Sequence, residues 1–169
     1  MIERYTDIIP EDQLDVIRTM ILDPARIWRW QLSDHLLKDQ HLFLRSDLTD
    51  PECDFWATFV DPRLIEYHCP YNLILKDAYI NLNIPGLGGN WHLDTVDPTD
   101  QGITVLYYPA LESLGLGGGT EFRNLGIMDY IPNSMIIFPA NIEHRAEPHS
   151  QLATYRFTVA FKLRPKTPL

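Results

Sequence analysis

Trp91-His92-Leu93-Asp94 is the stretch around which the rest of the chain can be interpreted. If it is extended, successive side chains point to opposite faces, so His92 and Asp94 share one face and Leu93 takes the other. An imidazole and a carboxylate side by side supply two of the three ligands in a 2-His-1-carboxylate site, which binds Fe(II) and leaves coordination positions open. Because His-x-Asp also occurs on ordinary surface strands, this interpretation requires a second histidine farther along the chain.

The second histidine predicted for this site is His144. A strand-like segment brings the chain to Pro139, and a short loop returns it with His144 at its exit. Four other histidines are available: His35, His41, His68 and His149. The reason for preferring His144 lies in the strand that comes after it.

That strand, Thr154–Lys162, alternates between a bulky apolar face and a face of small and polar residues. The apolar face suits packing against N-terminal helices and consists of Tyr155, Phe157, Val159 and Phe161. The opposite face places Arg156 and Thr158 between Thr154 and Ala160. Arginine offers a planar fork of donors to a carboxylate, and the Thr158 hydroxyl can add a hydrogen bond. We therefore expect this face to form the floor of a carboxylate-binding pocket.

The strand predicted before the metal motif, Tyr71–Ile84, shows the same alternation in its second half. Tyr79, Asn81 and Asn83 share one face, and the residues between them are aliphatic. Such a pattern is typical of a strand with one face on a core. A glycine-rich turn then leads into the metal motif.

The remaining segments predict helices first and many short strands afterwards. Residues 10–21 have helical periodicity, residues 27–37 form a second amphipathic segment that should pack on a sheet, and residues 46–52 form an acidic, turn-rich loop. Extended segments are expected over residues 55–60, 64–68, 71–84, 103–108, 120–122, 135–138 and 152–163. This order is typical of an α+β fold whose strands form a sandwich or barrel.

Composition indicates one soluble domain. The 169 residues suffice for a two-layered core, and no apolar run is long enough to span a membrane. The N-terminus lacks a signal-peptide core and the two cysteines have no metal spacing, so a reducing, cytoplasmic location is expected. The net charge is −9, with 14 acidic and seven basic side chains in residues 1–70. Because phosphate binding needs clustered Lys and Arg, this balance disfavours a nucleic-acid partner.

The order His92-x-Asp94, His144, Arg156-x-Thr158 resembles the Fe(II)- and 2-oxoglutarate-dependent dioxygenases, in the manner of small prolyl-hydroxylase-like members. The resemblance covers about residues 75–163. It implies a double-stranded β-helix, a jelly-roll or cupin-like barrel, with the N-terminal helices packed on one sheet. The chain would then be a single domain over residues 1–169. Its barrel core would be residues 71–163, and residues 1–70 would be a helical buttress with access loops.

The resemblance also implies roles for individual residues. His92, Asp94 and His144 would bind the metal and, with Arg156, make up the catalytic set. Arg156 would hold the distal carboxylate of 2-oxoglutarate, assisted by Thr158, at a position where many prolyl hydroxylases have lysine. Further candidates for contact with the cosubstrate lie on the strands before and after the metal motif: Tyr79, Asn81, Asn83, Tyr107 and Tyr108.

The implied cofactors are Fe(II), 2-oxoglutarate as cosubstrate and O2, with ascorbate as a stimulant. The implied reaction is hydroxylation of a peptidyl or free amino acid, proline among them, or of a related small metabolite, with succinate and CO2 as coproducts. Neither nucleic acid nor membrane is an expected partner. Three alternatives remain open: a zinc-dependent hydrolase using the same ligands, a non-oxidative cupin-like binding or isomerase module, and a catalytically silent barrel that only binds a partner.

Overall fold

The computed structural model describes residues 1–32, 42–67, 72–95, 97, 99–111, 117–149 and 155–166. Its helices are α1 (Leu14–Ile21), preceded by the 3-10 turn η1 (Glu11–Gln13), and α2 (Asp50–Glu66). Its strands are β1 (Glu3–Thr6), β2 (Arg29–Leu32), β3 (Leu42–Asp47), β4 (Leu73–Asn83), β5 (Ile103–Tyr108), β6 (Thr120–Phe122), β7 (Gly126–Met128), β8 (Ser134–Pro139), β9 (His144–Ala146) and β10 (Arg156–Pro165).

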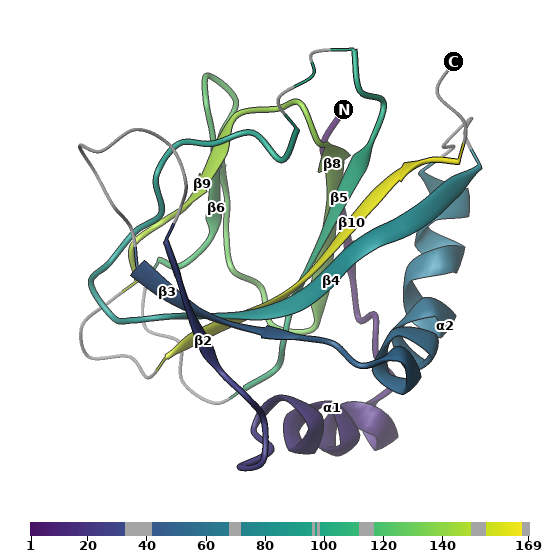
Figure 1. Cartoon of the computed structure of the whole chain (residues 1–169), viewed down its shortest axis with the longest axis vertical. Helices are drawn as coiled ribbons and strands as arrows, with labels where there is room; N and C mark the ends of the chain where they lie inside the picture. Colours follow the sequence, from purple (N-terminus) through teal and green to yellow (C-terminus); the bar gives the residue numbers. More distant parts are fainter. Residues whose placement is uncertain are drawn as a thin grey trace.

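Within these ranges the strands form two antiparallel sheets (Figure 1). The major sheet has the order β1-β8-β5-β10-β4-β3-β2, and the minor sheet has the order β7-β6-β9. Both helices lie along one side of the major sheet, and the minor sheet lies on its other side. The architecture is therefore mostly β-structure with two helices.

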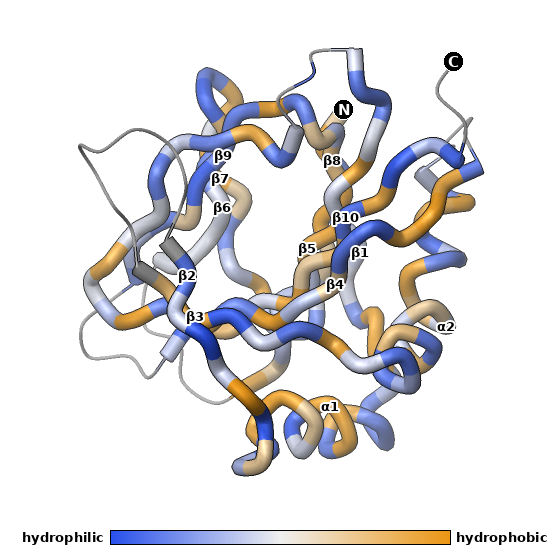
Figure 2. The backbone as a smooth tube through the Cα atoms, in the orientation of Figure 1, coloured by the Kyte–Doolittle hydropathy of each residue, from blue (hydrophilic) through white to orange (hydrophobic). Residues whose placement is uncertain are grey.

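The alternation predicted for β10 is confirmed where the structure describes it. Phe157, Val159 and Phe161 belong to a core shared with α1 and α2, and the Phe161 ring centroid lies 5.6 Å from that of Trp56. Figure 2 shows hydrophobic and hydrophilic residues following one another along both helices. Tyr155, assigned to the same face, is 55% exposed and lies outside this core. The position of Thr154 falls outside the described residues.

A second hydrophobic cluster lies between the two sheets. It combines side chains from β5, β8 and β10 with Phe122 of β6, whose ring meets that of Phe138 edge-on at 4.9 Å. The strands predicted over residues 103–108, 120–122 and 135–138 are confirmed as β5, β6 and β8. Each of these strands was recognisable because apolar and β-branched residues stand between clear turn signals.

The prediction of extended segments over residues 55–60 and 64–68 is wrong as far as the chain is described, because α2 runs through them. Thr49 and Glu52 form a capping box, and Pro51 stands in the first turn, where proline is tolerated. The helix therefore also begins inside the segment predicted as an acidic loop. Aromatic residues suggested strands here, but Trp56 lies on a helix. From there its ring packs on that of Tyr107, with the two ring centroids 4.9 Å apart.

Residues 1–70 do more than was expected of a helical region, since they supply β1, β2 and β3 to the major sheet. The helix over residues 10–21 is confirmed as η1 and α1. The segment predicted over residues 27–37 contains the strand β2, and its part beyond Leu32 lies outside the described residues. Trp28 does pack on the sheet, with its ring 6.1 Å from Phe157. Among the described helices, none combines the length and apolar character needed to cross a membrane.

Candidate active site

The three metal ligands predicted from the sequence come together between the sheets. His92 pairs with His144 at the start of β9 through two backbone hydrogen bonds of 3.0 Å each. The backbone N–H of Asp94 donates to the carbonyl of Ala140 at 3.0 Å, which fixes the far end of the motif. One ligand atom from each of the three side chains lies within 4.8 Å of the other two.

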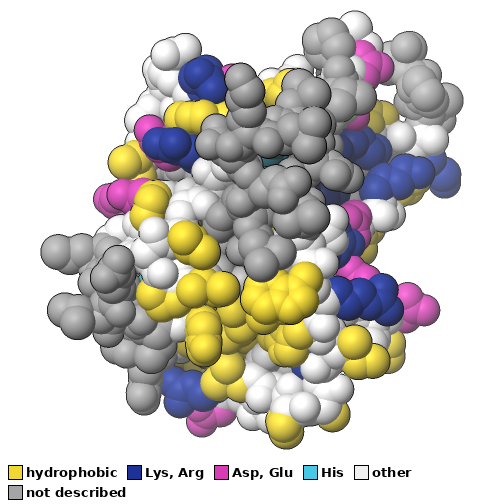
Figure 3. Space-filling view, turned by 60° about the vertical axis from the view of Figure 1, so that its left-hand side comes forward, with side chains coloured by type: hydrophobic (Ala, Val, Ile, Leu, Met, Phe, Trp, Pro, Cys, Tyr) yellow, Lys and Arg dark blue, Asp and Glu magenta, His cyan; other side chains and the backbone are white. Residues whose placement is uncertain are grey.

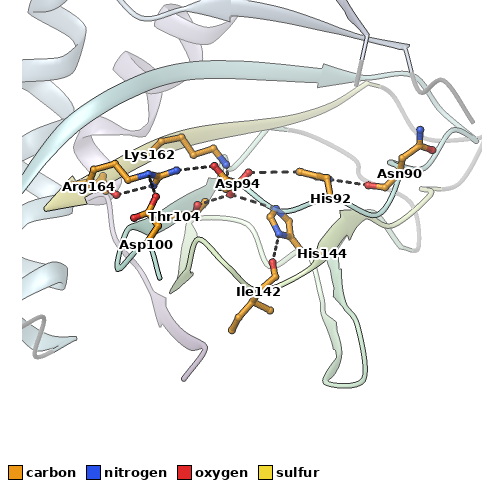
Figure 4. A network of polar contacts seen from close by, with 10 residues as sticks. Asn90, His92, Asp94, Asp100, Thr104, Ile142, His144, Lys162 and Arg164 are labelled. Carbon is orange, nitrogen blue, oxygen red and sulfur yellow. Dashed lines mark hydrogen bonds and ion pairs between the residues drawn. The ribbon is translucent and has the colours of Figure 1, made fainter. Parts of the chain in front are cut away.

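Both imidazoles present the same nitrogen to the centre of this cluster (Figure 4). Nδ1 of His92 lies 2.8 Å from the carbonyl of Asn90, and Nδ1 of His144 lies 2.9 Å from the carbonyl of Ile142. Because a carbonyl only accepts, each Nδ1 carries the hydrogen and each Nε2 keeps its lone pair. The Nε2 atoms lie 3.7 and 3.6 Å from the Asp94 carboxylate oxygens. Two imidazole nitrogens and one carboxylate fit a divalent metal such as Fe(II).

The protonation states suit metal binding. Burial lowers the pKa of His144 to about 4, so this imidazole is neutral near pH 7. Burial would raise the pKa of Asp94, but the nearby Lys162 ammonium and the two histidines outweigh it and hold that pKa below its usual value. A neutral imidazole and an ionised carboxylate are the forms that ligate metals.

A cavity of about 240 Å³ opens beside the cluster. Besides the three metal ligand candidates, its wall contains five of the seven residues predicted to contact the cosubstrate: Tyr79, Asn81, Asn83, Arg156 and Thr158. The alternation of β4 and β10 explains this, since Thr158 pairs with Asn81 and Arg156 pairs with Asn83 across the two strands. Side chains that face the same side of neighbouring strands thus line one pocket.

Arg156 is buried at the end of this pocket and already has protein partners. Its guanidinium donates to the carbonyls of Gly118 and Gly119, the latter at 3.0 Å, and to Oδ1 of Asn83 at 3.1 Å. These contacts use three of the five N–H groups of an arginine, so within the described structure two remain for a ligand. A lysine ammonium has fewer donors and no planar fork, so it could not make all three of these contacts and still offer two N–H groups to a ligand.

Asn81 carries an acceptor that no described residue satisfies. Its Oδ1 is buried and has no hydrogen-bond partner among the described residues, although the side chain lines the cavity. A buried amide oxygen without a partner costs free energy unless a ligand or water supplies a donor. Asn81 therefore remains a candidate for ligand contact, alongside Tyr79 and Asn83.

Tyr107 and Tyr108, also predicted as candidates for cosubstrate contact, are not among the described residues that line this cavity. Tyr107 lies on the helix side of β5, where its ring packs on Trp56 and its hydroxyl donates to Oδ1 of Asn133 at 3.1 Å. Tyr108 lies on the other side of the same strand, and its hydroxyl donates to Thr120 at 2.8 Å. Every residue of β5 is buried, so hydropathy alone could not assign its two faces.

The position of Tyr107 predicts that removing its hydroxyl affects stability and not cosubstrate binding. Tyr107→Phe should lose the hydrogen bond to Asn133 and about 1 kcal/mol of the free energy of unfolding. The concentration of 2-oxoglutarate that gives half-maximal binding should stay unchanged, because the hydroxyl points away from the cavity. Urea unfolding and cosubstrate titration measure the two quantities separately. A weakened cosubstrate affinity with unchanged stability would restore the original interpretation.

Several residues in or beside the pocket were not predicted from the sequence. Lys162 forms an ion pair with Asp94, the Thr104 hydroxyl donates to Asp94 Oδ2 at 2.5 Å, and Arg45 lies over the Tyr79 ring at 3.8 Å. The signal for Lys162 was present, because the alternation that places Arg156 on the pocket face continues to Lys162 six residues later. Of the other histidines, His149 is buried outside the cluster, and residues 35, 41 and 68 lie outside the described ranges.

No protein-family model matches this sequence, and no curated protein matches it. Solved structures do match it in fold. A prolyl hydroxylase from Trichoplax adhaerens, in complex with a hypoxia-inducible-factor peptide, aligns with a TM-score of 0.73 at 15% identity, over 98% of this chain and 84% of that one. HygX from Streptomyces hygroscopicus, with nickel and 2-oxoglutarate bound, aligns with a TM-score of 0.71 at 11% identity, over 98% and 83%.

A third match is a 2OG-Fe(II) oxygenase family oxidoreductase from Burkholderia pseudomallei, with a TM-score of 0.70 at 12% identity, over 96% of this chain and 84% of that one. At such low identities these likenesses show the fold. The chain thus has the fold of 2OG-Fe(II) oxygenases and prolyl hydroxylases, as the sequence resemblance predicted.

Proposed function

We propose that this chain is an Fe(II)- and 2-oxoglutarate-dependent oxygenase that hydroxylates a peptidyl or free amino acid, or a related small metabolite. The observation that carries the proposal is the placement of two chemically different sites in one cavity. His92, Asp94 and His144 form a 2-His-1-carboxylate cluster, and Arg156 offers donors on the same cavity wall. A dicarboxylate that chelates a metal at one end needs such a pair of sites.

The residues of the cavity would have separate roles in binding the metal and the cosubstrate. His92, Asp94 and His144 hold Fe(II), which when bound couples the oxidative decarboxylation of 2-oxoglutarate by O2 to oxidation of a substrate C–H bond. Arg156 binds the distal carboxylate through its remaining N–H groups, and Thr158 adds a hydroxyl to that contact. Leu106, which belongs to the apolar cluster between the sheets, lines the cavity and would help to exclude water from it. Ascorbate would serve only to keep the iron reduced.

Asp94 also bears on the outcome of the reaction. In the related halogenases the corresponding position is a small residue, and a halide takes the place of the carboxylate. Here a carboxylate is present and lies within 3.7 Å of both histidine Nε2 atoms. Hydroxylation is therefore the outcome that the ligand set supports.

The arrangement of the strands supports a double-stranded β-helix as the common framework. The minor sheet lies opposite the major sheet, with the cavity between them. The structures from Trichoplax adhaerens and Burkholderia pseudomallei each align over nearly the whole of this chain. We infer one domain over residues 1–169. Residues 71–163 would carry the metal and cosubstrate sites, and the preceding residues would cover one sheet and shape access to the cavity.

The substrate class is inferred from charge and from the aligned structures. Their names include a peptide complex for the Trichoplax adhaerens enzyme and a hygromycin B complex for HygX, so this fold admits both peptides and small molecules. The net charge is −9, and on the face in Figure 3 the coloured Lys and Arg side chains are scattered among acidic and hydrophobic ones. A polyanionic nucleic acid is a poor partner for such a surface.

A zinc hydrolase would use the same three ligands. A zinc hydrolase would not need the two N–H groups of buried Arg156 that have no protein partner among the described residues. A cupin-like isomerase would not need them either. Both alternatives predict that 2-oxoglutarate is not consumed. The choice among them can therefore be made with one assay.

The test is aerobic incubation with Fe(II), ascorbate and 2-oxoglutarate, with proline-containing peptides, free amino acids and methylated oligonucleotides offered in parallel. We expect succinate to form and a peptide or an amino acid to gain one oxygen, as read by mass spectrometry. Boiled protein and zinc-loaded protein are the controls. Demethylation of the oligonucleotide alone would contradict the substrate class, and hydrolysis without succinate would contradict the reaction.

A further inference from the structure

Lys162 is a buried cation inside the candidate active site. It lies on the pocket face of β10, its side chain is only 12% exposed, and its ammonium forms an ion pair with Asp94 and lies 6.0 Å from the centroid of the Tyr79 ring. Figure 4 shows it reaching from β10 towards the Asp94 carboxylate. A lysine this buried requires a partner, because an isolated ammonium in such a place is very costly.

The two carboxylate oxygens of Asp94 have different surroundings. Oδ2 receives the Lys162 ammonium and the Thr104 hydroxyl, the latter at 2.5 Å. Oδ2 also lies 3.6 Å from His144 Nε2, and Oδ1 lies 3.7 Å from His92 Nε2. Among the described residues, Oδ2 is therefore held by an ammonium and a hydroxyl group, whereas Oδ1 has only a histidine beside it.

The neighbouring cations do not share this task. Arg164 donates to the backbone carbonyl of Asp94 at 2.7 Å, but its guanidinium pairs with the Asp100 carboxylate at 2.9 Å. Arg45, on the other side of Tyr79, pairs with Asp47 and Asp77. Among the described residues, the Asp94 carboxylate therefore has Lys162 as its Lys or Arg partner.

We propose that Lys162 is a positioning residue and the built-in counter-cation of Asp94. Together with Thr104 it holds Oδ2 and reserves Oδ1 for the metal, so that Asp94 gives the metal one oxygen. The charge of Lys162 compensates Asp94 while the chain folds, before any metal binds. The same charge repels a divalent cation. Lys162 therefore lowers the affinity for metal and stabilises the metal-free fold. The proposal depends on the proposed function only for the identity of the metal.

The test uses Lys162→Met, which keeps the length of the side chain and removes the charge. The metal-free variant should melt about 10 °C below the wild type, because Asp94 is left buried without its counter-cation. Mn(II), followed by its electron paramagnetic resonance signal, should bind on the order of tenfold more tightly than to the wild type, because a repelling charge is gone. Bound Mn(II) should therefore raise the melting temperature more in the variant. Lys76→Met, the same change at an exposed lysine of β4, is the matched control and should alter neither quantity.

A lysine with a merely structural role would give a different result, in which stability falls and Mn(II) affinity falls with it or stays unchanged. That outcome, or a variant with wild-type values of both, would overturn the proposal. If Lys162→Met does not fold, the double variant Asp94→Asn/Lys162→Met decides the matter. Removing both charges should restore folding, since a buried pair can be replaced by neutral groups at little cost, whereas a double variant that also fails to fold would count against the proposal.

The failure of this proposal and the failure of the proposed function can be told apart. The melting and Mn(II) measurements need no turnover and no cosubstrate. If the wild type consumes no 2-oxoglutarate, and Lys162→Met still loses stability while gaining metal affinity, the role of Lys162 is supported and the proposed oxygenase function is refuted. A wild type that turns over 2-oxoglutarate, with Lys162→Met losing stability and metal affinity together, would do the reverse.

Discussion

Replacing His144 by alanine is expected to lower Fe(II) affinity by at least about a hundredfold and to abolish 2-oxoglutarate turnover. Loss of groups that merely support metal ligands already costs about ten- to a hundredfold, and His144 is placed as a ligand. Its Nε2 lies 3.6 Å from Asp94 Oδ2, and its Nδ1 is already turned to the carbonyl of Ile142. Anaerobic titration with Fe(II) and 2-oxoglutarate, followed by the visible charge-transfer band, measures the loss.

The alanine variant also opens a hole, because the His144 ring packs against Phe138 at 4.8 Å. His144→Gln fills most of that space without offering an imidazole and is the control for packing. Both variants should lose iron, and His144→Gln should keep more of the free energy of unfolding. A folded His144→Ala protein with wild-type iron affinity and turnover would show that the metal assignment is mistaken.

Arg156→Ala is expected to raise the half-saturating concentration of 2-oxoglutarate by about ten- to a hundredfold. Charge-assisted hydrogen bonds to a carboxylate are worth about 1.5–3 kcal/mol, which corresponds to that range. The same change leaves the carbonyls of Gly118 and Gly119 without their buried donor, at a further cost of about 1–3 kcal/mol in the free energy of unfolding. Initial rates at varied 2-oxoglutarate and thermal melting measure the two effects.

Two further variants separate these effects. Arg156→Lys keeps the charge but not the planar fork, so it should recover part of the cosubstrate affinity and little of the contact with the glycines. Arg29→Ala, at a side chain of β2 that is 75% exposed, is the matched control and should change neither quantity much. If a folded Arg156→Ala protein shows wild-type dependence on 2-oxoglutarate, the residue serves the fold and the cosubstrate lies elsewhere.

The sequence was most informative where one face of a strand is polar and the other apolar. In β4 and β10 the alternation assigned Asn81 and Thr158 to one face, and the structure pairs them across the two strands on the cavity wall. A period of two leaves no choice once one face is known to be buried. The same rule, carried one step past Ala160, would have placed Lys162 in the pocket.

The failures arose where periodicity carried no information. All six residues of β5 are buried, so Tyr107 and Tyr108 could not be assigned to faces without the tertiary structure. In α2 the aromatic side chains favoured strands, while the decisive signal was the capping box of Thr49 and Glu52 at its start. The contributions of β1, β2 and β3 to the major sheet are long-range pairings, which local patterns do not encode.

The position of His144 at the start of β9 has a consequence for local unfolding of the protein. It begins β9, a strand of three residues in a sheet of three short strands, whereas β5 and β8 lie inside the major sheet. Elements this short open by local unfolding at a lower free energy than central strands. A ligand that binds only the closed form adds its binding free energy to that opening. Metal binding should therefore slow amide hydrogen exchange in β9 and in the His92–Asp94 segment far more than in β5, so that loading the site changes the order in which the fold comes apart.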